Sequence, residues 1–279
     1  MVILVDGVNA ATGGALGYVR SVRPADVSAV AFDESVRLDW ERLAPGVELA
    51  VVQGAGSRAQ RLKTHLRELR KELGSDDFLT LVVPEVLESK GLLELVSRPG
   101  LHRLKAALLT EPGVQVLDVP LIAGDAVDSA EDFEEPARNY ALVLVSGVHN
   151  ATLQAIEYAE TLRPTDLRAV SFGLDALATE RLGDEWLASG IPHPLEIDHS
   201  PFRDIGGSLI EYIRHLEPDG RNRVVTVVMP EFVVSSWRHQ LLHGQTALFI
   251  KRRLLFEKGV VAVSVPYHLQ REIPEAASS

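Results

Sequence analysis

Short runs of apolar, mostly β-branched residues alternate along the chain with segments whose apolar residues recur at helical spacing. The run at residues 2–5, for example, ends at an Asp-Gly pair, after which Asn9 is a suitable helix N-cap. Runs without polar alternation are typical of strands buried on both faces of a parallel sheet. Alternating strands and helices therefore predict an α/β fold with right-handed crossovers. The predicted strands are residues 2–5, 26–32, 47–52, 78–83, 114–119, 141–145, 167–172, 193–197, 223–229 and 260–265. The predicted helices are one beginning after Asn9, 33–43, 57–73, one ending at 109, 150–162, 175–188, 203–216 and 245–256.

This pattern occurs twice, because residues 2–32 resemble residues 142–172 at an offset of 140. After a six-residue difference in length the resemblance continues at an offset of 146. A repeat this long is a whole folding unit, since solenoid repeats are only about 20–50 residues long. Matching residues include Gly7 and Gly147, Tyr18 and Tyr158, Trp40 and Trp186, Pro84-Glu85 and Pro230-Glu231, and Lys105 and Lys251.

The repeat divides the chain into two halves, residues 1–122 and 140–270, each expected to form a domain with its own five-stranded parallel sheet. Residues 123–139 contain six acidic residues and little hydrophobic pattern, so they predict a solvated linker, and residues 271–279 predict a disordered tail. If the halves pair through their last strands, 114–119 would lie antiparallel to 260–265 and two exposed edges would be removed at once.

Composition limits the classes of function. The formal net charge of −11 argues against a general nucleic-acid-binding protein, which would present a basic surface. The chain has no cysteine, which excludes disulfides, thiolate metal sites and thiol catalysis. Its longest apolar runs are far shorter than the roughly 20 residues of a membrane helix, and no signal peptide is evident. We therefore expect a soluble, cytoplasmic protein without direct membrane insertion.

Each half resembles the universal stress protein family, which has a Rossmann-like fold related to the adenine nucleotide alpha hydrolases. The resemblance lies in the ILVDG segment at residues 3–7, the Ala15-Leu16 pair and the five-strand alternation. It implies adenine-nucleotide binding in a stress or regulatory role. Nucleotide-binding members carry a glycine pair after the fourth strand, whereas this chain has Pro230 and Val233 there and matches the family pattern only around Gly244.

The second half also resembles the cytoplasmic C-terminal domain of bacterial permeases of the amino-acid/polyamine/organocation superfamily, some of which import potassium. The segments that carry this resemblance are GVHNAT (147–152), SPFR (200–203), VVMPEF (227–232), LLHGQTALFIKRRLLF (241–256) and GVVAVSVPYHL (259–269). The resemblance implies a regulatory role, with cyclic di-AMP as the ligand of some members.

Ligands of open parallel sheets bind outside the carboxyl ends of the strands, so the loop after the first strand of each half is a candidate site. Its alternative role is to cap a helix. In the second half, the start of the helix at His243-Gly244 offers free N–H groups to a phosphate, although plain capping explains it equally well. Arg203 is a second candidate phosphate ligand and Phe202 a candidate stacking residue, and the alternative is a proline-initiated helix with Phe202 in the core. The predicted ligand-binding residues are Asp6, Gly7, Asn9, Ser146, Gly147, His149, Asn150, Phe202, Arg203, Pro230, Glu231, Arg238, Gly244, Gln245 and Thr246.

Two further features have simpler explanations. His239 and His243 share a helix face, but the sequence offers no fixed third ligand, so we expect no metal. The helix at 57–73 carries six basic residues (Arg58, Arg61, Lys63, Arg67, Arg70 and Lys71) mixed with acidic ones. A solvated face is the first interpretation and docking to an acidic partner or membrane surface the second.

The sequence contains no nucleophile elbow, no P-loop and no dinucleotide-binding glycine motif. We therefore expect a non-enzymatic, adenine-nucleotide-binding regulatory protein whose ligand is ATP, AMP or cyclic di-AMP. Three alternatives remain: a regulatory region of a permease, which would have a membrane transporter as its partner, a ligand-free interaction module, and a weak nucleotide hydrolase. The sequence leaves open whether two chains associate further.

Overall fold

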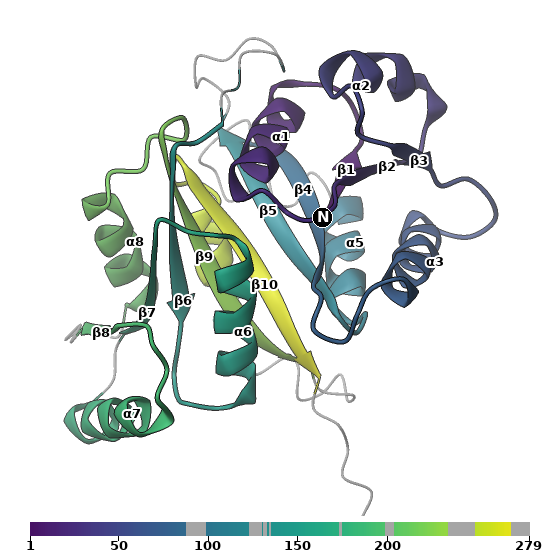
Figure 1. Ribbon diagram of the computed structural model, residues 1–279. Coiled ribbons are helices and arrows are strands. Elements are labelled where there is room, and N and C mark those ends of the chain that lie inside the picture. The colour runs from purple at the N-terminus through teal and green to yellow at the C-terminus, as the bar shows by residue number, and fades with distance from the viewer. Residues whose placement is uncertain are drawn as a thin grey trace, which may run out of the picture.

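The computed structural model describes residues 1–87, 99–122, 130, 133, 135–172, 175–198, 204–233 and 249–268. Within them the chain forms one ten-stranded sheet with helices on both faces (Figure 1). The strand order is β3-β2-β1-β4-β5-β10-β9-β6-β7-β8, and every neighbouring pair is parallel except β5 and β10. The strands are β1 (Val2–Val5), β2 (Ser28–Ala31), β3 (Leu49–Val51), β4 (Leu79–Leu87), β5 (Val114–Ile122), β6 (Arg138–Leu144), β7 (Asp166–Phe172), β8 (Leu195–Asp198), β9 (Arg223–Val233) and β10 (Val260–His268).

The helices begin where the sequence supplies caps. Asn9 accepts hydrogen bonds from the backbone N–H groups of Ala11 and Thr12, and Ser57 and Gln60 form a reciprocal capping box. The helical elements are α1 (Ala10–Val22), the 3₁₀ turn η1 (Glu34–Val36), α2 (Arg37–Leu43), α3 (Arg58–Lys71), α5 (Pro99–Leu109), α6 (Asn150–Thr161), α7 (Ala176–Ser189) and α8 (Ile205–His215), and residues 249–254 are also helical.

The two halves meet at the junction between β5 and β10, which we call the seam. Leu117 pairs with Val263, which is the same position in the repeat, so the approximate two-fold axis passes through this pair. The predicted antiparallel contact between the last strands of the halves is therefore confirmed. The prediction of a separate five-stranded sheet for each half is corrected, because the seam hydrogen bonds join all ten strands into one sheet.

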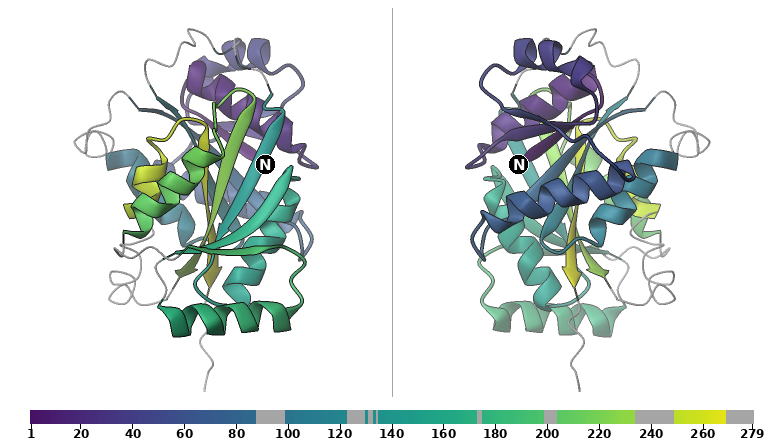
Figure 2. Two further views of the ribbon diagram at one scale, coloured as in Figure 1. Left: turned by 90° about the vertical axis from the view of Figure 1, so that its left-hand side faces the viewer. Right: turned by 90° about the vertical axis from the view of Figure 1, so that its right-hand side faces the viewer.

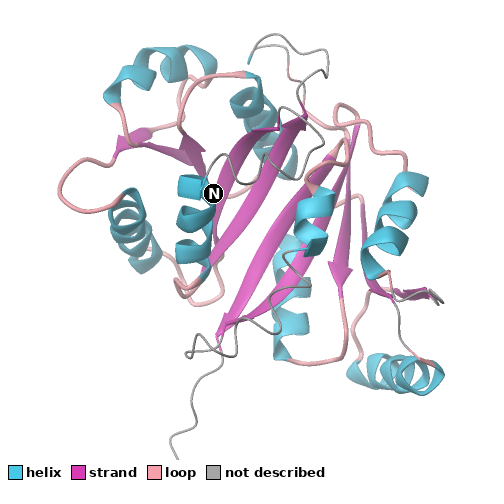
Figure 3. Ribbon diagram, turned by 180° about the vertical axis from the view of Figure 1, so that it is seen from behind, coloured by secondary structure: helices cyan, strands magenta, loops and turns pink. Residues whose placement is uncertain are grey.

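The two faces of the sheet are built differently. On one face, buried residues of α1, α2, α6 and α7 form a single hydrophobic core that continues across the seam. On the other face, α3 and α5 cover one core in the first half, and α8 and residues 249–254 cover a separate core in the second half. Figure 2 shows the molecule from its two sides and Figure 3 from behind, with helices on either side of the twisted sheet. The continuous core makes the halves parts of one folded body.

Two reciprocal hydrogen bonds fasten the shared core. The hydroxyl of Tyr18 in α1 lies 2.9 Å from that of Thr226 in β9, and the hydroxyl of Tyr158 in α6 lies 3.2 Å from that of Thr80 in β4. Each bond joins a helix of one half to a strand of the other, as in a two-fold symmetric interface. All four residues are buried, and burial raises the pKa of both tyrosines.

We expect Tyr18→Phe and Tyr158→Phe each to lower the free energy of unfolding by about 1–2 kcal/mol, because each leaves a buried threonine hydroxyl without one partner. Thr226 also donates to Asn139, whereas Tyr158 is the partner found for Thr80, so Tyr158→Phe should be the more harmful change. Urea unfolding of both variants checks this order. Losses in the free energy of unfolding that differ by less than about 0.3 kcal/mol would contradict it.

The connection between the halves contacts the first helix directly. A Cβ atom added at Gly13 would collide with the backbone carbonyl of Ala130, and one added at Gly14 would lie 3.0 Å from the ring of Phe133. The two glycines therefore provide the space in which the connection packs. Residues 123–139 were predicted to form a solvated linker, whereas Ala130 and Phe133 of this segment pack against α1.

Candidate functional site

The loops after β1 and β6 were the first predicted site, and most of their polar side chains serve the fold. The Asn9 side chain caps α1, and the Thr12 hydroxyl donates to the carbonyl of Gly7 at 2.6 Å. In the second half, His149 Nδ1 accepts the backbone N–H of Thr152 at 3.2 Å, while the Thr152 hydroxyl donates to the carbonyl of Gly147 at 2.7 Å. Both loops thus close into the same turn.

The protonation state of His149 follows from its role as a helix cap. Burial lowers the pKa of His149, although a backbone hydrogen bond opposes this effect. A neutral imidazole can accept through Nδ1, as the cap requires, whereas a protonated ring is a donor at both nitrogens. Helix capping is therefore the established task of His149 in this fold.

The two loops lie at opposite ends of the sheet, because the strands of the two halves run antiparallel to each other. The structure therefore does not bring Asp6, Gly7 and Asn9 together with Ser146, Gly147 and Asn150. Any ligand sites at the carboxyl ends of the strands are two separate sites.

In the second half, three aromatic rings gather beside the loop after β6. The ring of Phe232 lies edge-on to His149, with centroids 4.9 Å apart, and edge-on to Tyr267, with centroids 6.2 Å apart. Asn150 Nδ2 donates to the Tyr267 hydroxyl at 3.3 Å, and Phe232 remains 44% exposed. We call these four residues the aromatic cluster. The corresponding residues of the first half are Asn9, Val86, Leu121 and Ala10, so the cluster belongs to the second half alone.

In the first half, the equivalent end of the sheet is basic. The guanidinium groups of Arg58 and Arg61 lie over the ring of Phe32, at 5.0 and 5.4 Å from its centroid. Arg58 is also 3.7 Å from Asp6, and Arg61 donates to the carbonyl of Val52 at 2.8 Å. Asp6 therefore has a cationic partner at the surface.

Two further basic residues of α3, Lys63 and Arg67, hold α3 against the end of α5. Arg67 makes a bidentate pair with the buried Glu111 at 2.5 and 2.9 Å. Lys63 donates to Thr110 at 3.0 Å and lies 3.6 Å from Glu111. These contacts place Lys63 and Arg67 beside Glu111, and Arg67 is still 59% exposed, in agreement with the interpretation of a solvated face.

Pro230 and Glu231 lie within β9, which extends to Val233, beyond the predicted end at residue 229. The Glu231 carboxylate accepts a hydrogen bond from Ser264 in β10. Phe202, Arg203, Arg238, Gly244, Gln245 and Thr246, together with His239 and His243, lie outside the described residues. The predicted phosphate contacts at Arg203 and Gly244–Thr246 therefore stay predictions.

Glu231 is one end of a polar network that crosses the seam. Lys105 Nζ lies 2.8 Å from Glu85 Oε2 and 2.7 Å from Asp118 Oδ1, and Lys251 Nζ lies 2.6 Å from Asp118 Oδ2. Lys251 also donates to Ser264 Oγ at 2.9 Å. We call these six residues the seam network: Glu85, Lys105, Asp118, Lys251, Ser264 and Glu231.

Asp118 is the centre of the seam network and is fully buried. Burial acts to raise the pKa of Asp118, but the charges of Lys105 and Lys251 outweigh it and hold this pKa below its ordinary value. Burial likewise acts to lower the pKa of Lys105, and the carboxylates of Asp118 and Glu85 outweigh it and raise this pKa. The carboxylate is thus kept ionised by one lysine from each half.

Asp118 and Ser264 were not predicted to be members of a cluster. A signal was present, since both polar residues occupy the same repeat position within strand runs that are mostly apolar. An isolated carboxylate in such a run needs a buried cationic partner.

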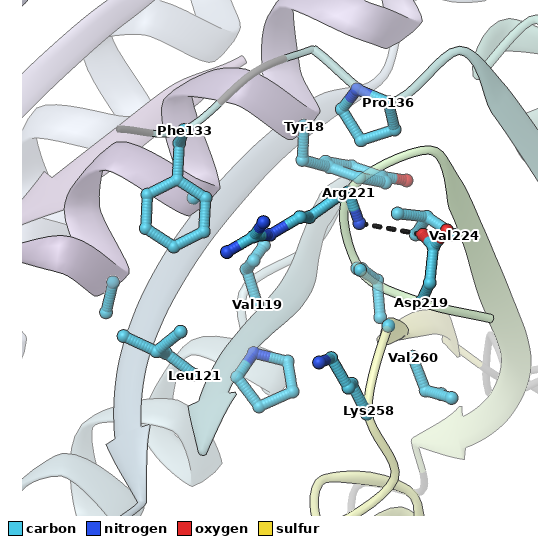
Figure 4. Close-up of a pocket in the computed structure, with 16 residues that line it drawn as sticks. Tyr18, Val119, Leu121, Phe133, Pro136, Asp219, Arg221, Val224, Lys258 and Val260 are labelled. Carbon is cyan, nitrogen blue, oxygen red and sulfur yellow. Dashed lines mark hydrogen bonds between the residues drawn. The ribbon is translucent and has the colours of Figure 1, made fainter. Parts of the chain in front are cut away.

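A small cavity also lies at the seam, between α1, the end of β5 and the starts of β9 and β10. Phe133 and Arg221 point toward it from the connection and from the turn before β9 (Figure 4). Three backbone N–H groups hold Asp219 Oδ1 in that turn at 2.7–2.9 Å. The cavity encloses about 70 Å³. That volume is well below the roughly 300 Å³ at which ligand pockets begin. Among the described residues, no group of acidic, histidine or cysteine side chains is placed to hold a metal ion.

No helix in the described part of the chain combines the length and the apolar character needed to cross a membrane. The family model described as the KimA potassium transporter C-terminal domain matches residues 1–121 and 137–267. The potassium transporter KimA of Bacillus subtilis (strain 168) is 25% identical over 142 residues, which are 50% of this chain and 23% of the transporter. The chain thus matches less than a quarter of that relative's length.

Two solved structures show a similar fold. A universal stress protein from Archaeoglobus fulgidus DSM 4304 has a TM-score of 0.56 at 13% identity, covering 95% of this chain and 98% of that protein. The cytoplasmic domain of a prokaryotic cation chloride cotransporter has a TM-score of 0.50 at 10% identity. The match covers 94% of this chain and 93% of that domain. The expected resemblance to universal stress proteins and to cytoplasmic transporter domains is confirmed at the level of fold.

Proposed function

Because this chain belongs to the family of KimA potassium transporter C-terminal domains, we propose that it acts as the regulatory domain of a potassium transporter on the cytoplasmic side of the membrane. The observation that carries the proposal is the family match, which extends through both halves of the chain. The fold similarity to a cotransporter cytoplasmic domain supports the same role. Regulation is the role favoured here over transport, because the described residues form a sheet-and-helix body.

The test is potassium uptake by cells whose only potassium transporter is a KimA-type protein from the same organism, with and without this chain. We expect the chain to change the initial uptake rate at least twofold. Asp118→Ala, which disrupts the seam, should abolish the effect, and Arg42→Ala on the exposed face of α2 should retain it. Identical uptake with the wild-type chain, with Asp118→Ala and without the chain would refute the regulatory role.

We also propose that the second half binds an adenine nucleotide, for which ATP, AMP and cyclic di-AMP are the candidate ligands. The aromatic cluster supports this proposal, since an exposed ring at the carboxyl end of a parallel sheet offers a stacking surface to a base. Stacking of a base on an aromatic side chain contributes about 1–3 kcal/mol. The edge contacts from His149 and Tyr267 fix the orientation of the Phe232 ring.

Isothermal titration with the three nucleotides tests this second proposal. We expect Phe232→Ala to weaken binding about tenfold or more, because it removes the stacking surface. Val86→Ala changes the matching position of the first half and should leave the affinity unchanged. Flat titrations with all three nucleotides would exclude nucleotide binding and leave the transporter role to be judged by uptake.

A further inference from the structure

The seam network joins two places that lie far apart on the sheet. Glu85 and Glu231 are equivalent in the repeat and stand on β4 and β9, with β5 and β10 between them. Three strand spacings separate their backbones by about 14 Å laterally, and the antiparallel halves add a further displacement along the strands. Residues this far apart normally make independent contributions to stability.

The contacts between them are continuous. Glu85 contacts Lys105, and both Lys105 and Lys251 contact Asp118. Lys251 in turn donates to Ser264, and Ser264 donates to Glu231. Asp118 is the point that both halves share, since one of its oxygens lies against the lysine of each half.

The charges of the network do not balance. It contains three carboxylates but two ammonium groups, and Asp118, Lys105 and Glu85 are buried. Neutralising either glutamate leaves two carboxylates for two lysines, so each lysine keeps a partner. Neutralising both leaves one carboxylate for two buried ammonium groups, and an unpaired buried charge is costly.

We propose that the seam network couples the ends of β4 and β9 energetically, with Asp118 as the shared counter-ion through which a change at Glu85 alters the environment of Glu231. A change in charge at the carboxyl end of the strands in one half then alters the stability of the contacts in the other half. The coupling is a property of the folded chain, so it holds whether or not the proposed transporter role or nucleotide binding is correct.

A double-mutant cycle tests the proposal without any ligand. The variants are Glu85→Gln, Glu231→Gln and the double mutant, with the unfolding equilibrium constant measured in urea. Each single change is expected to raise the unfolding equilibrium constant by some factor. We expect the double mutant to raise it at least tenfold more than the product of the two single factors. A factor of ten corresponds to about 1.4 kcal/mol.

The same cycle in two further backgrounds separates the network from direct repulsion between the two glutamates. Asp118→Asn removes the shared charge, and Ser264→Ala cuts the link to Glu231 while Asp118 keeps both lysines. We expect the coupling to fall below twofold in each background that folds, and Ser264→Ala is the milder change.

A matched control uses Glu111 and Glu257, which are also equivalent in the repeat and pair with Arg67 and Arg214 at the outer ends of α5 and residues 249–254. Their cycle should be additive within twofold. Additive effects of Glu85→Gln and Glu231→Gln, or coupling that persists unchanged with Ser264→Ala, would overturn the proposal.

Discussion

Replacing Asp118 with alanine is expected to lower the free energy of unfolding by about 3–5 kcal/mol. Asp118 is fully buried and is the carboxylate that Lys105 and Lys251 share across the seam. Removing one member of a buried ion pair leaves its partner charged and desolvated, and here two lysines are affected. Urea or thermal unfolding of the purified variant measures the loss.

The matched control is Ser264→Ala, because Ser264 occupies the Asp118 position of the second half. It removes a hydroxyl that bridges Lys251 and Glu231 but leaves both lysines beside Asp118. We expect it to cost about 1–2 kcal/mol. Losses of equal size in the two variants would contradict the central position of Asp118.

The same group gives a pH dependence with a definite sign. The pKa of Asp118 is lowered in the folded protein relative to its ordinary value of 3.8. Such a carboxylate stabilises the fold above the unfolded-state pKa, and the stabilisation is lost as pH falls through the folded-state pKa. Below about pH 4 the wild type should therefore lose stability more steeply than Asp118→Ala. Parallel acid-unfolding curves would contradict this assignment.

The second large effect is expected at Gly259, in the turn before β10. Its φ of +70° lies in the left-handed region, where a side chain costs roughly 1–2 kcal/mol. A Cβ atom there would also lie 2.5 Å from the backbone nitrogen of Gly220. Because neither backbone can yield easily, we expect Gly259→Ala to lower the free energy of unfolding by about 3 kcal/mol or more.

Gly190→Ala separates the two causes. Gly190 has the same φ of +70° at the end of α7, but a Cβ atom there would meet nothing within 4 Å. We expect a loss of only about 1 kcal/mol, the conformational part alone. If Gly190→Ala and Gly259→Ala are equally destabilising in urea, then close packing between Gly220 and Gly259 makes no contribution.

The sequence predicts much of the sheet because its strands are apolar, β-branched runs, a local signal. The repeat adds long-range information: it identifies 114–119 and 260–265 as equivalent last strands, and their antiparallel contact is confirmed. Pairing of the last strands already implies that the two sheets join. Neither signal contains the register of that pairing, in which Leu117 lies opposite Val263.

The seam network illustrates what lies beyond local patterns. Lys105 and Lys251 are recognisable as equivalent residues, yet their shared partner is found only when β5 and β10 are aligned. Likewise, the sequence alone leaves open whether Gly13 and Gly14 weaken their helix or permit close packing, and in the structure they make room for Ala130 and Phe133. The function of a glycine pair depends on the segment that packs against it.

The candidate site was predicted less completely. The sequence points correctly to the loops after β1 and β6 as turns at the carboxyl ends of strands, and the capping roles of Asn9 and His149 fit the alternative stated for them. The aromatic cluster was missed because Phe232 and Tyr267 look like ordinary strand residues. Only the parallel pairing of β9 with β10 places them side by side.

The most direct test of the account is amide hydrogen exchange across the seam. If the halves form one folded body held together by β5 and β10, the central amides of these two strands should exchange as slowly as those of β1 and β6, at the rate of global unfolding. Exchange of β5 and β10 that is faster by a factor of a hundred or more, with β1 and β6 still protected, would show that the halves separate in solution and would contradict it.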